Sequence, residues 1–278
     1  MFDPSSTLTR LASRYELRRE IGRGSTACVY LADDLSTGSP VAVKVLHPEL
    51  ATSTSVARFR REIQLLTGLR HSSLLPVLDW GDEFGGLFLV MPYVDGETLT
   101  ARLARIGQFS LHDLIGITRP IAAGVDYAHE RGIIHRDIKP GNILLDGNRV
   151  LLCDFGIARA MVPAPSQSVS SSGLVIGTSE YMSPEQAGGD QHVDARADIY
   201  ALGCVAFEML TGEVPFAGST SQIVIRRHLT ELPRSIRSVR SDVPDYVERA
   251  VHAAMAKDPS DRPPTASAFV DLLDVPGA

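Results

Sequence analysis

The stretch that decides the fold reads His135-Arg136-Asp137-Ile138-Lys139-Pro140-Gly141-Asn142, and Asp154-Phe155-Gly156 follows it. Between them, two strand-like apolar runs, Ile143–Leu145 and Val150–Cys153, flank an Asp146-Gly147 turn. This pattern predicts a β-hairpin, which brings the polar residues before and after it close together. The residues expected to meet are Asp137, Lys139, Asn142 and Asp154.

The residue types in this set suit the transfer of a phosphoryl group. Asn142 and Asp154 offer oxygen ligands to Mg²⁺, which prefers few protein ligands together with phosphate oxygens. Asp137 can accept the proton of an attacking hydroxyl, and Lys139 can offset charge on the transferred group. Each residue alone has an ordinary structural interpretation, but the ordered set indicates a catalytic loop.

A lysine ends a predicted buried strand, Val41-Ala42-Val43-Lys44. Burying an ammonium costs free energy unless it meets an anion. A helix predicted over residues 56–69 supplies a candidate, because Glu62 shares its apolar face with Phe59 and Ile63. The sequence therefore predicts a Lys44–Glu62 ion pair. The alternative is that Glu62 reaches solvent among the neighbouring arginines.

A glycine-containing turn, Gly22-Arg23-Gly24-Ser25-Thr26-Ala27-Cys28-Val29, lies between two predicted strands. Glycines let backbone amides approach phosphates closely, so this hairpin can lie over a triphosphate. Ala27 stands where the usual pattern has a third glycine. Taken alone, the segment is equally well explained as a tight hairpin.

Composition excludes several other classes of protein. The 278 residues carry a net charge of −6, which argues against nucleic acid as the main partner. No apolar run approaches the roughly 18 residues of a membrane span, so no membrane contact is expected from this segment. The three cysteines are far apart, which indicates neither a disulfide framework nor a zinc site and favours a reducing compartment.

The order of elements predicts a small β-rich lobe, a hinge near residues 92–95 and a larger helical lobe. Strands are expected at Tyr15–Ile21, Cys28–Ala32, Val41–Leu46 and Leu87–Met91. Helices are expected at Leu99–Ile106, over a longer segment that ends near Gly132, and at Ile199–Leu210. Pro120 lies inside the longer helix and is expected to kink it.

On these motifs the chain resembles the eukaryotic-like serine/threonine protein kinases, particularly the bacterial branch, over residues 15–274. The resemblance continues through Gly177–Glu185, which looks like the family's substrate-docking loop, with Ser183 in place of an alanine. Asp198 matches the aspartate that braces the catalytic loop in the family. Arg262 resembles the arginine that pairs with the equivalent of Glu185.

The resemblance implies an α+β, bilobal protein kinase fold. A small antiparallel sheet with one regulatory helix would form the N-lobe, and a larger, mainly helical C-lobe would follow it. We expect a flexible lead at residues 1–14, the N-lobe and hinge at 15–94 and the C-lobe at 95–278. The implied activity is transfer of the γ-phosphate of Mg-ATP to serine or threonine hydroxyls of protein substrates in signalling, with Mn²⁺ as an alternative metal.

Residue by residue, the resemblance also implies a site. The catalytic residues expected are Asp137, Lys139, Lys44 and Glu62, and the metal ligands are Asn142 and Asp154. The nucleotide-binding residues expected are Ile21, Gly22, Gly24, Val29, Ala42, Lys44, Met91, Val94, Asn142 and Asp154. Met91 takes the gatekeeper position. Pro92 departs from the pattern, but the family uses the carbonyl there and the amide at Val94, so adenine binding is expected to survive.

Regulation is expected from the Ser-rich segment that lies between Asp154-Phe155-Gly156 and Ser183-Pro184-Glu185. Ser170 and Ser172 best match the positions phosphorylated in bacterial relatives, and a phosphate there can pair with Arg136. Autophosphorylation in trans through a transient homodimer is the expected route. The alternative is that Met161–Gly173 is only a flexible linker. The expected location is the cytoplasm, either alone or as the cytoplasmic domain of a longer, membrane-anchored kinase.

Two other classes of protein are alternatives to an active protein kinase. A pseudokinase usually lacks the lysine, the catalytic aspartate or the magnesium aspartate, whereas Lys44, Asp137 and Asp154 are all present. A small-molecule phosphotransferase of related fold usually lacks the segment that Gly177–Glu185 and Asp198 provide here.

Overall fold

The computed structural model describes residues 10–11, 13–47, 53–83, 86–156, 179–190 and 192–275. These residues divide into two compact units. One unit contains the described residues up to His71 together with Leu75–Asp95. The other contains Ser72–Leu74, Gly96–Phe155 and the described residues from 179 onward.

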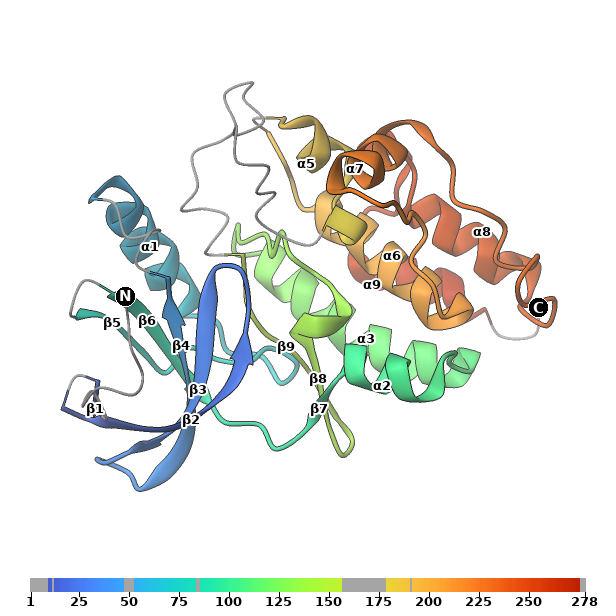
Figure 1. Ribbon diagram of the computed structural model, residues 1–278. Coiled ribbons are helices and arrows are strands. Elements are labelled where there is room, and N and C mark those ends of the chain that lie inside the picture. The colour runs from blue at the N-terminus through green and yellow to red at the C-terminus, as the bar shows by residue number, and fades with distance from the viewer. Residues whose placement is uncertain are drawn as a thin grey trace. The chain divides into compact units, whose positions relative to one another are not determined.

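In its described residues, the first unit comprises a six-stranded antiparallel sheet and helix α1, labelled in Figure 1. Its strand order is β1-β2-β3-β4-β6-β5. The strands are β1 (Arg10–Leu11), β2 (Tyr15–Arg23), β3 (Ala27–Asp34), β4 (Ser39–Leu46), β5 (Asp79–Glu83) and β6 (Gly86–Pro92). Strand β1 lies within the predicted lead, where Leu11 is buried. The sequence did not predict β5.

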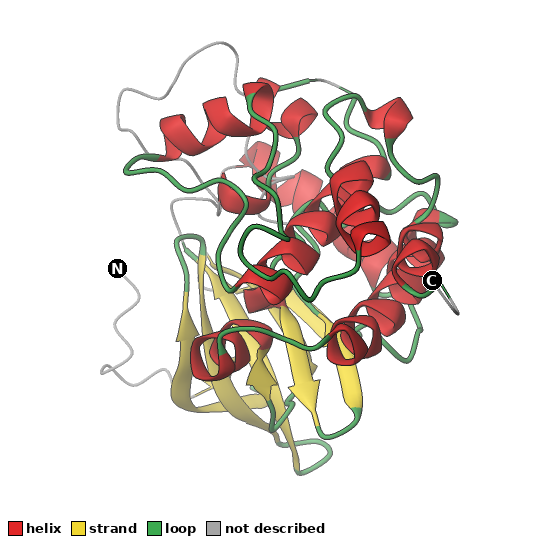
Figure 2. Cartoon of the chain, turned by 90° about the vertical axis from the view of Figure 1, so that its right-hand side faces the viewer, coloured by secondary structure: helices red, strands yellow, loops and turns green. Residues whose placement is uncertain are grey.

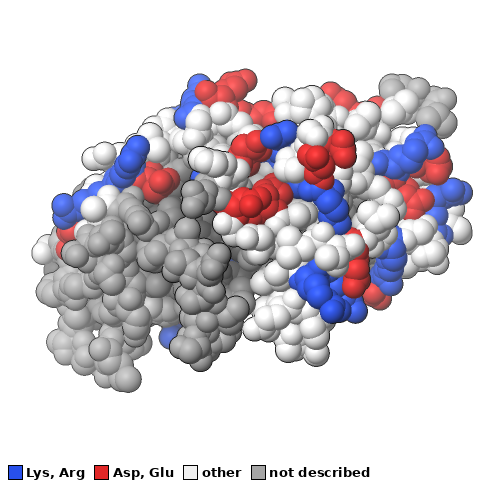
Figure 3. Space-filling view, turned by 90° about the horizontal axis from the view of Figure 1, so that it is seen from above, with Lys and Arg blue, Asp and Glu red and all other residues white. Residues whose placement is uncertain are grey.

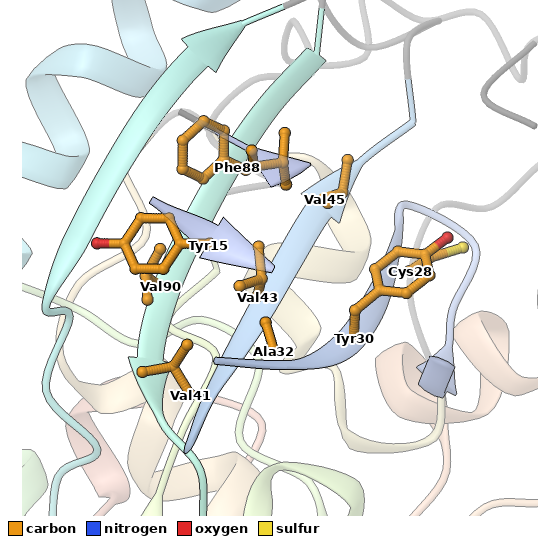
Figure 4. Close-up of a cluster of buried hydrophobic side chains, with 10 residues drawn as sticks. Tyr15, Cys28, Tyr30, Ala32, Val41, Val43, Val45, Phe88 and Val90 are labelled. Atoms are coloured by element: carbon orange, nitrogen blue, oxygen red, sulfur yellow. The ribbon is translucent and has the colours of Figure 1, made fainter. Parts of the chain in front are cut away.

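Alternation of side chains builds the core of this sheet (Figure 4). Val41, Val43 and Val45 point to the same face of β4 and pack with Tyr30 of β3 and Phe88 of β6, because side chains two apart share a face. Lys44 belongs to the opposite face and is only half-buried. The strand prediction for this lysine is confirmed.

Helix α1 (Ser53–Leu66) completes the first unit. It was predicted over residues 56–69, so the prediction placed it about one turn too late. Its first turn is formed by Ser53–Ser55, just before the predicted start. The Phe59 ring packs edge-on against Trp80 of β5 at a centroid distance of 5.9 Å, which attaches the helix to the sheet.

The second unit is mainly helical (Figure 2). Its helices are α2 (Leu99–Ile106), α3 (Leu111–His129), α5 (Pro184–Gly188), α6 (Arg196–Thr211), α7 (Ser221–Thr230), α8 (Asp245–Ala254) and α9 (Ala266–Leu273). The described residues also contain short 3₁₀ turns: η2 (Pro140–Asn142), η3 (Ser179–Tyr181) and η4 (Pro259–Asp261). Helix α3 continues through Pro120 as one element.

Helix α6 is the centre of this unit. Fourteen of its sixteen residues are buried, as expected for a helix that is apolar all round. Gly203 permits the closest approach, since an added Cβ would lie 2.9 Å from the Cβ of Ala254 in α8. None of the described helices combines the length and the apolar character that crossing a membrane requires.

A three-stranded antiparallel sheet in the second unit carries the predicted hairpin. Its strands are β7 (Glu97–Thr98), β8 (Ile143–Asp146) and β9 (Arg149–Leu152). Asp146 pairs directly with Arg149, so the turn is Gly147-Asn148 rather than the predicted Asp146-Gly147. The positive φ of Gly147, +56°, is what a tight two-residue hairpin turn requires.

Candidate active site

Three predicted site residues meet in the loop before β8. The Asp137 Oδ2 atom accepts a bond from Lys139 Nζ at 2.8 Å and another from Asn142 Nδ2 at 3.0 Å. Asn142 Nδ2 also donates to the Asp137 main-chain carbonyl at 2.8 Å, and Asn142 is buried. The prediction that these three residues lie together is confirmed.

The hairpin places Asp154 beside this group through its neighbour Cys153. The Cys153 amide donates to the Asn142 carbonyl at 2.9 Å, and the Cys153 carbonyl accepts from His135 Nε2 at 3.0 Å. Asp154 follows with φ of +61°, a conformation uncommon for a residue other than glycine. Such strain persists where the surroundings fix it, and it clusters at functional sites.

His135 holds this arrangement from inside. It is 1% exposed, and its ring lies 4.5 Å from the Phe155 ring. Its Nδ1 accepts the Asp137 amide at 3.2 Å, so the proton belongs on Nε2, which donates to Cys153. Burial lowers the pKa of His135, which keeps the ring neutral. With both ring nitrogens bonded to the backbone, His135 has a structural role.

Asp198, at the start of α6, braces the loop. One carboxylate oxygen accepts the Arg136 amide at 2.8 Å, and the other accepts the His135 amide at 2.8 Å. The second oxygen also bonds His129 Nε2 at 2.8 Å. These bonds hold Arg136 at φ of +64°. The predicted bracing by Asp198 is confirmed, but His129 was missed, because its helix-end position carries no signal for this role.

The described end of the predicted docking loop is tied to the same framework. Ser183 N-caps α5 in a capping box with Gln186, whose Nε2 also donates to the Arg136 carbonyl at 3.1 Å. An alanine, which the kinase pattern has at this position, could not accept this capping bond. Glu185 accepts two bonds of 2.7 Å from Arg262, so that predicted pair is confirmed.

A second carboxylate in this region was not predicted. Tyr181 Oη donates to Glu208 of α6 at 2.5 Å. Burial raises the pKa of Glu208, and the Tyr181 bond partly offsets that rise. Tyr181 belongs to η3, so this bond attaches the docking loop to the central helix. No sequence pattern predicted the Tyr181–Glu208 bond, because the two residues are 27 positions apart.

The predicted nucleotide residues of the first unit lie on or beside four neighbouring strands, β2, β3, β4 and β6. Gly22 pairs with Val29 across the β2–β3 hairpin, which the Gly24 amide closes by donating to the Ala27 carbonyl at 2.9 Å. Lys44 pairs with Val29 on one side and Leu89 on the other. Ala42 of β4 pairs with Met91 of β6, and the Met91 side chain is buried. The Ile21 side chain is exposed. Val94 follows β6.

Glu62 and the Ser-rich segment complete the set of predicted site residues. Glu62 is half-buried in α1, as an inward-leaning carboxylate would be, but its pairing with Lys44 stays a prediction. Ser170 and Ser172 lie outside the described residues, as do Gly177 and Thr178. In the part of the chain that is described, no three His, Cys, Asp or Glu side chains gather as a metal site.

A family model described as "Protein kinase domain" matches residues 15–272. The chain belongs to the protein kinase family. Its type is that of the bacterial serine/threonine kinases. It is 42% identical over 277 residues to serine/threonine-protein kinase PknB of Mycobacterium leprae and 38% identical over 260 residues to PrkC of Bacillus subtilis. These matches cover 97% and 92% of this chain but 44% and 39% of those relatives, so the chain spans less than half of their length.

Solved structures agree with the bilobal α+β fold. The Mycobacterium tuberculosis PknI kinase domain matches with a TM-score of 0.75 and 30% identity, covering 94% of this chain and 95% of that one. Rad53 in complex with AMP-PNP matches with a TM-score of 0.77 at 24% identity, covering 93% of this chain and 64% of that one. The second similarity supports the fold alone. The family implies use of ATP with a divalent metal and of protein substrates.

Proposed function

We propose that this protein transfers the γ-phosphoryl group of ATP to serine or threonine hydroxyls of proteins, and that the catalytic loop of the second unit does the chemistry. The observation that carries the proposal is the Asp137–Lys139–Asn142 group, which Asp198 braces from the central helix. Phosphoryl transfer depends mainly on positioning and on electrostatic stabilisation, and a braced loop supplies both.

Asp137 is the residue proposed to receive the substrate hydroxyl. The bonds from Lys139 and Asn142 both engage Oδ2, which leaves Oδ1 for the hydroxyl hydrogen within the described part of the site. Oδ1 orients the hydroxyl oxygen toward the γ-phosphorus and takes its proton as the new O–P bond forms, while the bond from the γ-phosphorus to the bridging oxygen breaks and ADP leaves. The Lys139 ammonium, held on Oδ2, offsets negative charge on the transferred group.

Asn142 and Asp154 are proposed to hold the metal. Asn142 donates twice to Asp137 through Nδ2, so its amide oxygen remains for a cation, and Asp154 follows Cys153, whose amide is bonded to Asn142. Two protein oxygens suit Mg²⁺, and Mn²⁺ accepts the same ligands. The metal, when bound, neutralises charge on the ATP phosphates.

The first unit is proposed to bind the nucleotide. Lys44 would contact the α- and β-phosphates with Glu62 as its partner, and the Gly22–Val29 hairpin would cover the triphosphate. Ala42, Met91 and Val94 would take the adenine. Support comes from the β4–β6 pairing, which sets Ala42 opposite Met91.

Regulation by autophosphorylation at Ser170 and Ser172 is also proposed, in trans through a transient homodimer. Arg136 would receive the phosphate, and its backbone is held by Asp198 on one side and by Gln186 on the other. A cation on a fixed backbone is a suitable receptor for a phosphate. All three cysteines are free thiols, which fits the proposed cytoplasmic location.

Replacing Asp137 by asparagine tests the proposed chemistry. Asp137→Asn should lower kcat by roughly 10²–10⁴-fold, the usual contribution of a positioned general base. The Kd for Mg-ATP should stay near the wild-type value, because Asp137 is not among the proposed nucleotide ligands. Turnover and calorimetric ATP titration of the same two preparations give both numbers. A variant with wild-type kcat would refute the assignment, and a pair of proteins that both bind ATP without turnover would indicate a pseudokinase.

A further inference from the structure

Lys257 is the one lysine without a place in the proposed chemistry. Three of the 27 basic residues of the chain are lysines, and the other two are Lys44 and Lys139. The chain therefore uses arginine for its ordinary surface cations. A lysine differs from arginine in being a compact point charge whose pKa shifts readily on burial. The reason for a lysine at position 257 is therefore sought in the groups around it.

The Lys257 ammonium lies in a half-buried aromatic cage. It is 4.4 Å from the centre of the Phe216 ring and 5.8 Å from that of Tyr200 in α6. Its Nζ donates to the main-chain carbonyl of His228 at 2.7 Å, in the last turn of α7. A cation at a helix C-terminus is favourable, and a ring face adds attraction. Lys257 thus fixes the end of α7.

The same residue is tied to α5. Arg262 Nη2 donates to the Lys257 carbonyl at 3.2 Å, and the Arg262 guanidinium holds Glu185 of α5 through two bonds of 2.7 Å. The Arg262 guanidinium also lies over the Tyr200 ring, at 5.0 Å. A continuous set of contacts therefore runs from α5 through Arg262 and Lys257 to α7.

Helices α5 and α7 also pack against each other directly, and they are neighbours in Figure 1. An added Cβ on Gly188 would lie in ordinary contact, 3.8 Å, with Leu229 Cδ2 of α7. The His228 ring, buried in α7, bonds Tyr200 Oη at 2.9 Å and lies against Phe216. The relative position of α5 and α7 consequently depends on the contacts around Lys257.

Stability alone does not account for a charge at this position. Burial lowers the pKa of Lys257 to about 8 from 10.5, and Arg262 lowers it as well. Because the folded-state pKa lies below the unfolded one, the ammonium destabilises the fold. That cost is fully present below pH 8 and disappears as the pH rises toward 10.5. Groups whose pKa values are strongly shifted by burial cluster at functional sites.

We propose that Lys257 is a positioning residue for the protein acceptor: by joining α7 to α5, it sets the shape of the docking loop in its described part, from Ser179 to Glu185, and it touches neither the nucleotide nor the reacting atoms. This rests on the proposed function and on the docking role that the resemblance implies for Gly177–Glu185. The expected signature is a change in KM for the protein acceptor without a change in KM for ATP.

The first test compares Lys257→Met with wild type, using myelin basic protein as a general acceptor. Methionine keeps the length of the side chain and can rest between the rings, so the thermal midpoint should not fall. The KM for the acceptor should rise roughly three- to tenfold, because Lys257 acts on the acceptor only through the helices that it joins. The KM for ATP and the rate of ATP hydrolysis without acceptor should not change. Arg249→Met, which removes the same charge from the exposed surface of α8, should leave all four values unchanged.

The second test needs no variant. In wild type the KM for the acceptor should rise as the pH passes about 8. The groups facing Lys257 are Tyr200 and Cys204 of α6, His228 of α7, Glu231 after it, and Arg262 with Glu185. Burial raises the pKa of Tyr200 and of Cys204 and lowers that of His228 to about 4, so none of these three changes charge near pH 8. Lys257→Met should remove the step.

The outcomes separate the two proposals. Wild type that binds ATP but phosphorylates no acceptor refutes the proposed function. Wild type that turns over with a KM for the acceptor independent of pH from 7 to 9 refutes the role of Lys257 alone. A loss of kcat, or an equal rise in both KM values, in Lys257→Met would refute it as well, because a purely structural defect acts that way.

Discussion

The two units use buried polar groups differently. In the helical unit, the 1% exposed carboxylate of Asp198 holds the backbone on which Asp137 stands. In the sheet unit, the main polar network lies at one rim, where Tyr15 Oη donates to Asp79 at 2.6 Å and Arg14 bonds Asp34. Arg14 holds the pKa of Asp34 well below its usual range. The first network fixes the geometry of a reaction, whereas the second joins strand ends.

The surface shows a third use of charge. On the face drawn in Figure 3, basic and acidic side chains alternate rather than forming a patch of one sign. Ion pairs between exposed side chains, such as Arg234–Glu213, also occur in the helical unit. Exposed pairs of this kind contribute little stability. The buried groups, not these pairs, distinguish the two units.

The largest effect is expected from Asp198→Asn. The amide keeps one acceptor oxygen but cannot serve His135, Arg136 and His129 together. Misplacing the loop by about 1 Å should lower kcat about 10²-fold, and lost bonds to a buried carboxylate should cost about 3 kcal/mol of unfolding free energy. Turnover and thermal unfolding measure the two effects. Unchanged kcat in the folded variant would contradict the bracing role of Asp198. The two units would then no longer differ in how they use buried polar groups.

An intermediate effect is expected from Lys44→Met in the sheet unit. The proposed contact with the phosphates is charge-assisted, so its loss should weaken ATP binding by a factor equivalent to about 1.5–3 kcal/mol. Glu62→Gln should act in the same direction but less. Calorimetric titration with ATP measures both. Equal affinity of Lys44→Met and wild type would remove Lys44 from the nucleotide site.

The smallest effect is expected from Tyr15→Phe. The change removes the hydroxyl that bonds Asp79, whose side chain is 39% exposed and can be rehydrated. The expected cost is about 1 kcal/mol of unfolding free energy, with kcat and KM unchanged. Denaturant unfolding beside a turnover assay checks this. A fall in kcat would show that the polar network around Asp79 also positions reacting groups, as the network around Asp198 does.

Sequence patterns predicted the parts of the molecule whose signals are local. The two-residue alternation of Val41–Lys44 predicted the strand and the face of each side chain, and the ordered polar residues from His135 to Asp154 predicted the catalytic loop. The helix start at Ser53 and the turn at Gly147-Asn148 were misplaced, because several residues fit each turn nearly equally well. His129 and Lys257 were missed as determinants, since their roles depend on contacts with residues far away in the chain.

The most direct test of the account is the identity of the phosphorylated amino acid. Purified wild-type protein and Asp137→Asn are incubated with Mg-ATP and an acceptor protein, and the acceptor and the chain itself are examined by mass spectrometry. The account predicts phosphoserine or phosphothreonine on the acceptor with wild type and none with Asp137→Asn. Phosphate on tyrosine alone, or equal phosphate with both proteins, would contradict it.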